Sequence, residues 1–266
     1  RKRTPGHDYL IIKLGKPGSI SKVDVDTSHF NGNQPSMVSL EACYSKSNSI
    51  KNFKWKLLID KKKTKANSHH LFKTSSRSIV THVKLNIFPD GGVARLRLYG
   101  SISKENNNFG NKTVNLTSLL NGASVMACNN EHFGKAENIL APGKAKNMGD
   151  GWETRRRRDK GFDWLILNSI KGNKINKIEI STHHFKGNFP SHCSLQATYI
   201  TNKKTSSSIV TDSNKWKLLL DKVKLSANKT HVFKNKLMTN NKINYIKINI
   251  YPDGGISRFR MFGKSI

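Results

Sequence analysis

Apolar and polar residues alternate one by one along several short stretches of this chain, most clearly before and after two Pro-Asp-Gly-Gly sequences. A period of two places the apolar side chains on one face of a strand, so these stretches predict half-buried β-strands. Proline presets φ and glycine supplies a positive φ, so each Pro-Asp-Gly-Gly sequence predicts a hairpin that joins its two strands. Short strands about every ten residues indicate a β-sandwich. The alternating apolar positions are Val83, Leu85, Ile87, Ala94, Leu96 and Leu98 around the first turn, and Ile246, Ile248, Ile250, Phe259 and Met261 around the second.

This pattern occurs twice along the chain. The matched segments keep their apolar positions in step, and the extra residues of the second copy fall in polar Lys, Ser and Thr stretches. Surface loops tolerate such insertions and cores do not, so we predict two homologous domains. The clearest matches are Thr27–Ser36 with Thr182–Ser191, Trp55–Asp60 with Trp216–Asp221, and Asn86–Gly92 with Asn249–Gly255.

The segment between the two copies divides into an Asn-rich part and a leader of the second copy. We therefore expect a first repeat at 1–103, a linker at 104–112, and a second repeat with its leader at 113–266. A similar leader is expected to precede Arg1, so this interpretation makes the chain N-terminally incomplete.

Composition narrows the class of protein. Lys and Arg number 47 against 17 Asp and Glu, a formal charge of +30, which favours an anionic partner. No run approaches the ~20 apolar residues of a membrane-spanning helix, which argues against a membrane protein. Three cysteines in no Cys-x-x-Cys arrangement argue against a disulfide scaffold or a structural zinc site. They fit a reducing compartment, and we expect a cytoplasmic protein.

Four motifs together carry a family resemblance. They are Gly-Asp-Gly-Trp-Glu-Thr-Arg-Arg-Arg-Arg at 149–158, Gly-His-Asp-Tyr-Leu-Ile-Ile-Lys-Leu-Gly at 6–15, the two His-Phe-x-Gly-Asn-x-Pro sequences and the two Pro-Asp-Gly-Gly turns. With the tandem arrangement, they resemble the allantoicase family over essentially the whole chain. The resemblance implies an all-β fold of two homologous jelly-roll-like β-sandwich domains of the galactose-binding type. It also implies hydrolysis of allantoate to ureidoglycolate and urea in purine breakdown, by a homo-oligomer.

Allantoate carries one carboxylate and two ureido groups on a single carbon. Binding it calls for arginine, for amide or carboxylate acceptors, and for an acid/base pair. We expect the catalytic groups to be His7, Asp8, Asp26, His29, Glu153, Asp163 and His184, and the substrate-binding groups to be Arg3, Asn33, Arg155, Arg158, Asn188 and Arg258. We further expect one working site to draw on both repeats. No cofactor is assigned; no metal-ligand spacing appears on a predicted element, and a divalent metal ion stays open.

Some of these choices have alternatives. His29 and His184 can equally be hydrogen-bonded turn residues. Water can add to a ureido carbonyl, or urea can leave the central carbon before water adds. Phe162, Ser181 and Tyr245 replace His7, Asp26 and His82 of the first repeat, so a catalytically impaired binding module is the second hypothesis. The third is a nucleic-acid-binding protein, which the charge alone motivates, without a recognisable RNA- or DNA-binding motif.

Overall fold

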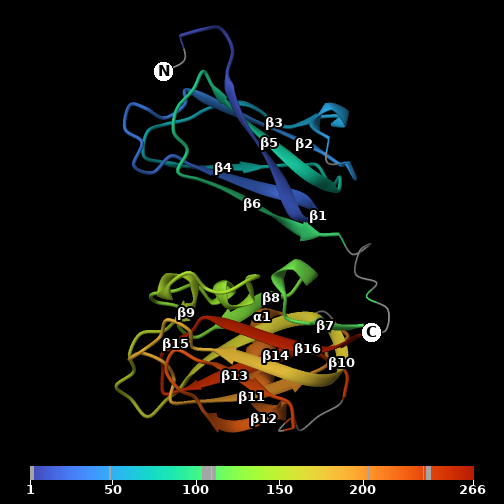
Figure 1. The fold of residues 1–266 in the computed structure, drawn as a ribbon, viewed down its shortest axis with the longest axis vertical. Helices are drawn as coiled ribbons and strands as arrows, with labels where there is room; N and C mark the ends of the chain where they lie inside the picture. Colours follow the sequence, from blue (N-terminus) through green and yellow to red (C-terminus); the bar gives the residue numbers. More distant parts are fainter. Residues whose placement is uncertain are drawn as a thin grey trace. The chain divides into compact units, whose positions relative to one another are not determined.

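The chain is represented by a computed structural model that describes residues 3–47, 49–103, 109, 112–202, 204–235, 237 and 241–266. It divides into two compact units, 1–106 and 107–266 (Figure 1). Most of the expected linker 104–112 lies outside the described residues. Strands are the main regular structure of both units, and the helices are short, so the prediction of an all-β fold is confirmed.

The first unit is built around one long strand, β1 (Asp8–Asp26). Its first half pairs with β5, and its second half lies between β4 and β6. The partner changes near Gly18, and β1 thereby belongs to both layers of a sandwich, one of order β3-β2-β5-β1 and one of order β4-β1-β6 (Figure 1). The other elements are β2 (Met37–Cys43), the 3-10 helix η1 (Ile50–Asn52), β3 (Lys56–Lys63), β4 (His69–Lys73), β5 (Val80–Phe88) and β6 (Arg95–Ile102).

The second unit repeats this topology around β10 (Asp163–Ser181). The first half of β10 lies between β14 and β8, and the second half lies between β13 and β16. Its strands are β7 (Thr113–Asn115), β8 (Ser124–Cys128), β9 (Trp152–Glu153), β11 (His192–Thr198), β12 (Lys217–Lys224), β13 (Thr230–Phe233), β14 (Ile243–Tyr251), β15 (Gly255–Ile256) and β16 (Arg258–Ser265). Its helices are η3 (Leu119–Asn121), η4 (Ala136–Leu140), η5 (Met148–Asp150), α1 (Ser206–Asp212) and η6 (Ser213–Lys215).

In the second unit, strands of the leader pack against the sandwich, and no such strands lie against the described part of the first unit. β8 pairs with the first half of β10, and β7 pairs with the edge of β16. Leu165 of β10 is consequently buried completely, whereas the matching Leu10 of β1 is 58% exposed.

Each unit encloses its own hydrophobic core between the two layers. The alternating residues that the sequence assigns to strands supply much of it: Val83 and Leu85 are buried in the first unit, and Ile246, Ile248 and Ile250 in the second. Ala94 is exposed and precedes β6. The described helices include none that is long and apolar enough to cross a membrane.

The predicted Pro-Asp-Gly-Gly hairpins are wrong. The first turn connects β5 to β6, and the second leads from β14 through the two-residue β15 to β16, but β5 does not pair with β6 and β14 does not pair with β16. Instead, β5 pairs with the first half of β1 and β6 with its second half, and β14 and β16 pair with the two halves of β10 in the same way. Because those halves lie in different layers, each turn crosses from one layer to the other, with Gly91 and Gly254 at φ of 131° and 128°.

A histidine holds a loop in each unit. His231 Nε2 accepts a hydrogen bond from the Ser226 amide at 2.9 Å, and Nδ1 lies 3.2 Å from the Ile180 carbonyl. His70 repeats the arrangement with the Lys65 amide and the Val25 carbonyl. A ring that accepts at Nε2 and donates at Nδ1 is neutral, and protonating it would place two donors face to face.

The stability of the second unit is therefore expected to fall with acid. Burial holds the pKa of His231 below its ordinary value of 6.5, so the unfolded chain takes up this proton first. The contribution of the neutral His231 ring to the free energy of unfolding is complete above about pH 6.5, and it is lost as the pH falls through the lowered pKa of the folded state. Urea unfolding between about pH 7.5 and 5 should show a shallower pH dependence in His231→Gln than in the unchanged chain. Equal slopes would contradict this role.

Candidate active site

The second half of β1 carries two carboxylates on the face that points away from the core. Val23 and Val25 enter the core, and alternation places Asp24 and Asp26 on the opposite face. Side chains on an outward face are ordinarily exposed to solvent, yet Asp24 and Asp26 are only 4% and 3% exposed. Neighbouring strands cover them, with His69 of β4 opposite Asp26 and Arg97 of β6 opposite Asp24.

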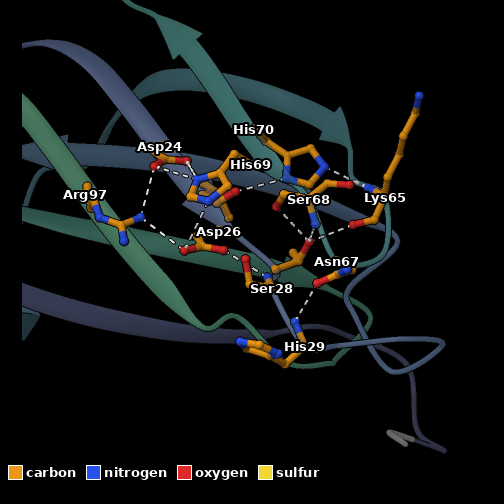
Figure 2. Close-up of polar contacts among 12 residues, drawn as sticks. Asp24, Asp26, Ser28, His29, Lys65, Asn67, Ser68, His69, His70 and Arg97 are labelled. Atoms are coloured by element: carbon orange, nitrogen blue, oxygen red, sulfur yellow. Dashed lines mark hydrogen bonds and ion pairs between the residues drawn. The ribbon is translucent and has the colours of Figure 1, made fainter.

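These four side chains form one cluster, which we call the Asp24–Asp26–His69–Arg97 cluster (Figure 2). Arg97 Nη1 donates to Asp24 Oδ2 at 3.0 Å and to Asp26 Oδ2 at 3.1 Å. His69 Nδ1 lies 3.0 Å from Asp24 Oδ2, and its Nε2 lies 3.7 Å from Asp26 Oδ2. The Ser28 amide donates to Asp26 Oδ1 at 2.9 Å, so both carboxylate oxygens of Asp26 are engaged.

The electrostatics of the cluster fix its charge state. Hydrogen bonds from Ser28, then the Arg97 guanidinium and the nearby His69, hold the pKa of Asp26 well below its usual range. The hydrogen bonds to Asp26 and Asp24 raise the pKa of Arg97 in return. Asp26 is thus an ionised acceptor, and Arg97 is a fixed cation.

Two members of the cluster reach the solvent. The Arg97 side chain is 38% exposed and that of His69 is 54% exposed. Both carboxylate bonds of Arg97 use Nη1, so the rest of the guanidinium is available to a ligand, with the exposed Arg95 two residues away on the same face of β6. An exposed cation, two buried carboxylates and a reachable imidazole lie side by side.

The second unit builds the same strand face with different side chains. Register places Thr230 and Arg258 opposite Ser181, and Arg260 opposite Glu179. Ser181 and Thr230 therefore stand where the first unit has Asp26 and His69. The second unit keeps the arginine and one acid but has no imidazole–carboxylate pair at these positions.

A second group of predicted residues lies by the Pro-Asp-Gly-Gly turn of the first unit. Asp8 and Asn33 line a pocket of about 580 Å³ together with Pro89 and Asp90. The Asn33 carbonyl accepts from the Gly92 amide at 2.8 Å. His7 lies beside this pocket's turn, with its ring 4.5 Å from Phe88 and its Nε2 3.2 Å from Asn86 Oδ1.

In the second unit, the leader contacts the equivalent turn. Arg157 donates to Asp163 Oδ1 at 2.7 Å and, through its amide, to Asp253 at 2.7 Å. Asn188 donates to Glu153. Asp163 is completely buried, and its Oδ2 has no hydrogen-bond partner in the described structure. The structure thus brings Glu153 to Asn188, and Asp163 to Arg157 rather than to the predicted Arg158.

The remaining predicted residues lie apart from the Asp24–Asp26–His69–Arg97 cluster or in structural contacts. Arg3 and Arg158 are exposed, and Arg155 contacts His132. His29 and His184 have left-handed backbones at φ of 70° and 73°, and their amides bond to Asn67 and Asn228. His184 Nε2 also lies 2.9 Å from the Ala145 carbonyl, and Arg258 binds Asp150 at 2.8 Å.

The site predicted from sequence contains Asp26 but not its partners Asp24, His69 and Arg97. A signal for Asp24 exists, because it lies two residues from Asp26 on a strand of period two. His69 and Arg97 are distant in sequence, and only the strand register brings them in. Among the described residues, no group of three or more His, Cys, Asp or Glu side chains is arranged to hold a metal ion.

The fold and the cluster together define a tandem β-sandwich protein with a buried carboxylate pair beside an exposed arginine and an exposed histidine. A family model of the allantoicase repeat matches residues 1–103 and 114–266. Probable allantoicases of Acinetobacter baumannii (strain SDF) and Photobacterium profundum are 45% and 43% identical, over 99% of this chain and 78% and 80% of their own lengths. A crystal structure of allantoicase from Saccharomyces cerevisiae matches with a TM-score of 0.82 at 31% identity, covering 98% of this chain and 79% of that one. The chain belongs to the allantoicase family.

Proposed function

We propose that the chain hydrolyses allantoate to ureidoglycolate and urea, and that the Asp24–Asp26–His69–Arg97 cluster does the chemistry. Family membership supports the reaction, and the cluster is the single observation that supports this location. It joins a solvent-facing cation, two buried carboxylates and a half-exposed imidazole within hydrogen-bonding reach of one another.

The two exposed groups of the cluster match parts of the substrate. Arg97, with Arg95, holds the allantoate carboxylate. The buried Asp24 and Asp26 hold Arg97 and His69 in position, and the exposed imidazole of His69 meets the ureido nitrogens. In the reaction the bond between the central carbon and one ureido nitrogen breaks, and a C–O bond between that carbon and water forms. The departing nitrogen gains a proton from His69 and leaves in urea. The incoming water then loses a proton to the same imidazole, so the site ends in its starting protonation state.

Urea release by the purified chain from allantoate tests the reaction directly. A urea signal above the enzyme-free blank is expected. No urea above that blank, with the protein folded by circular dichroism, would contradict the hydrolase and leave the binding module. That one site draws on both repeats stays a prediction.

The charge of +30 is expected to speed substrate encounter. Because salt screens charges beyond a Debye length of about 10 Å at 0.1 M, kcat/KM for allantoate should fall severalfold between about 0.02 and 0.2 M salt. The value of kcat should stay nearly constant, since the bound substrate already contacts its partners. A kcat/KM independent of salt would contradict electrostatic steering.

Assembly and location extend the proposal. Exposed apolar side chains of the first unit, including Tyr9, Leu57 and Leu71, support a homo-oligomer. Sedimentation equilibrium measures the oligomeric state, and a monomer at micromolar concentration would contradict the homo-oligomer.

The free thiols Cys43, Cys128 and Cys193 support a reducing, cytoplasmic location, which cell fractionation tests.

A further inference from the structure

The second unit contains a pocket over the strand face that corresponds to the catalytic cluster of the first. It has a volume of about 470 Å³, within the range of small-molecule sites. Strands β10, β13 and β16 form its floor with Glu179, Thr230 and Arg260, and the leader supplies Lys144 at its rim. The matching cluster in the first unit is half open, as the exposure of His69 indicates.

The charged groups of the pocket favour an anion. Lys144, Arg258 and Arg260 line it against the single acid Glu179. Arg258 is tied to Asp150 at 2.8 Å, so one cation is already neutralised. Glu179 is bonded to Lys177 at 2.8 Å. Arg260 donates to the Gly143 carbonyl, which is neutral, so the charges of Arg260 and Lys144 remain to attract a small negatively charged compound.

The neutral groups of the pocket favour a ligand with amide hydrogens. His183 Nδ1 lies 3.0 Å from Asn228 Oδ1, so this nitrogen carries the proton and Nε2 is left as an acceptor. Burial, with the adjacent His184 and Lys144, lowers the pKa of His183, which keeps the ring neutral near pH 7. Ser181 and Thr230 add hydroxyls 3.1 Å apart.

At the strand positions that match Asp26 and His69, the pocket has neither a carboxylate nor an imidazole. Ser181 takes the place of Asp26, and Thr230 takes the place of His69. A ligand can therefore be held by the same arginine position without meeting an ionised carboxylate and an imidazole in contact.

We propose that this pocket is a second, non-catalytic binding site for a small carboxylate that carries ureido or amide groups. The inference rests on the proposed function for its ligand chemistry, since it assigns the second repeat the same class of compound as the first. The two repeats then divide their roles: the first turns substrate over, and the second binds without turnover.

Isothermal titration of the full chain with N-carbamoylglycine tests this inference, because this carboxylate has one ureido group and lacks the second ureido nitrogen on the same carbon, whose lone pair assists the departure of urea from allantoate. Two sites per chain are expected. Arg260→Gln should leave one, and Thr230→Phe, which fills the pocket from an exposed strand position, should do the same. Glu179→Gln should tighten the second site about fivefold, because it removes the like charge. Arg77→Gln, an exposed arginine of the first unit, is the matched control and should keep both sites.

The outcomes separate this inference from the proposed function. One site per chain that persists in Arg260→Gln and Thr230→Phe, together with urea release, would overturn the second site and leave the hydrolase intact. Two sites with the expected losses but no urea release would support the second site and contradict the hydrolase. A weaker second site in Glu179→Gln would contradict the anion assignment.

Discussion

Replacing His69 by Asn is expected to lower kcat for urea release by about 10²- to 10⁴-fold, the usual contribution of a positioned acid or base. Asn preserves a polar group of similar reach but cannot exchange a proton near neutral pH. The side chain is 54% exposed, so the fold should persist. Because Arg97 still holds the carboxylate, KM should change much less than kcat. Steady-state urea release with circular dichroism measures both effects.

Two further histidine variants serve as comparisons for His69→Asn. In the described structure, the ring of His192 forms a hydrogen bond with Ser191 alone. His192→Asn is therefore the control and should keep full activity. His29→Asn tests the role predicted from sequence, since Asn tolerates the left-handed backbone at φ 70°. A His69→Asn chain as active as the unchanged protein, or a larger loss in His29→Asn, would contradict the placement of the site.

Replacing Phe185 by Ala is expected to destabilise the second unit by about 3–5 kcal/mol, the usual cost of deleting a buried phenyl ring. The ring is completely buried between the turn and the leader. A Cβ on Gly255 would lie 2.0 Å from this ring, and one on Gly151 would lie 3.0 Å from it, so both glycines leave room for it. Its loss leaves a cavity where the leader meets the turn. Urea unfolding followed by tryptophan fluorescence measures the change, since Trp152, Trp164 and Trp216 report on this unit.

Phe133→Ala is the matched control, because Phe133 is 62% exposed. Its free energy of unfolding should stay within about 0.5 kcal/mol of that of the unchanged chain. Equal effects of the two phenylalanine variants would contradict the packing role assigned to Phe185.

Strands and core are predictable here because alternation is local. The spacing of Val83 and Leu85, or of Ile246 and Ile248, reports burial directly from neighbouring residues. The pairing of strands is not local. The sequence places β5 beside β6 because a short turn joins them, but both strands pair with β1, which changes layer near Gly18. No short-range pattern distinguishes such a crossing turn from a hairpin.

The candidate site likewise contains one residue that is predictable from a single segment and others that are not. Asp26 stands out because it is the last residue of a period-two strand and precedes a repeated His-Phe sequence, so it is predictable from one segment. Its functional partners come from β4 and β6, at distances along the chain that only the register of the layer brings together. His184 shows the converse: its sequence suggests chemistry, while its ring holds the Ala145 carbonyl and its backbone forms a turn.

The position of the carboxylates within the layer has a kinetic consequence. Lys22–Asp26 pairs with β4 on one side and with β6 on the other, so exposing the backbone there requires both ladders to break. Amides in such doubly paired strands exchange with solvent mainly through the larger openings of a domain. The backbone amides of Asp24 and Asp26 are thus expected to exchange slowly, and the spacing of the two carboxylates is fixed before substrate arrives. Heat should therefore abolish activity together with the cooperative unfolding of that unit, rather than through an earlier loosening around the bound substrate.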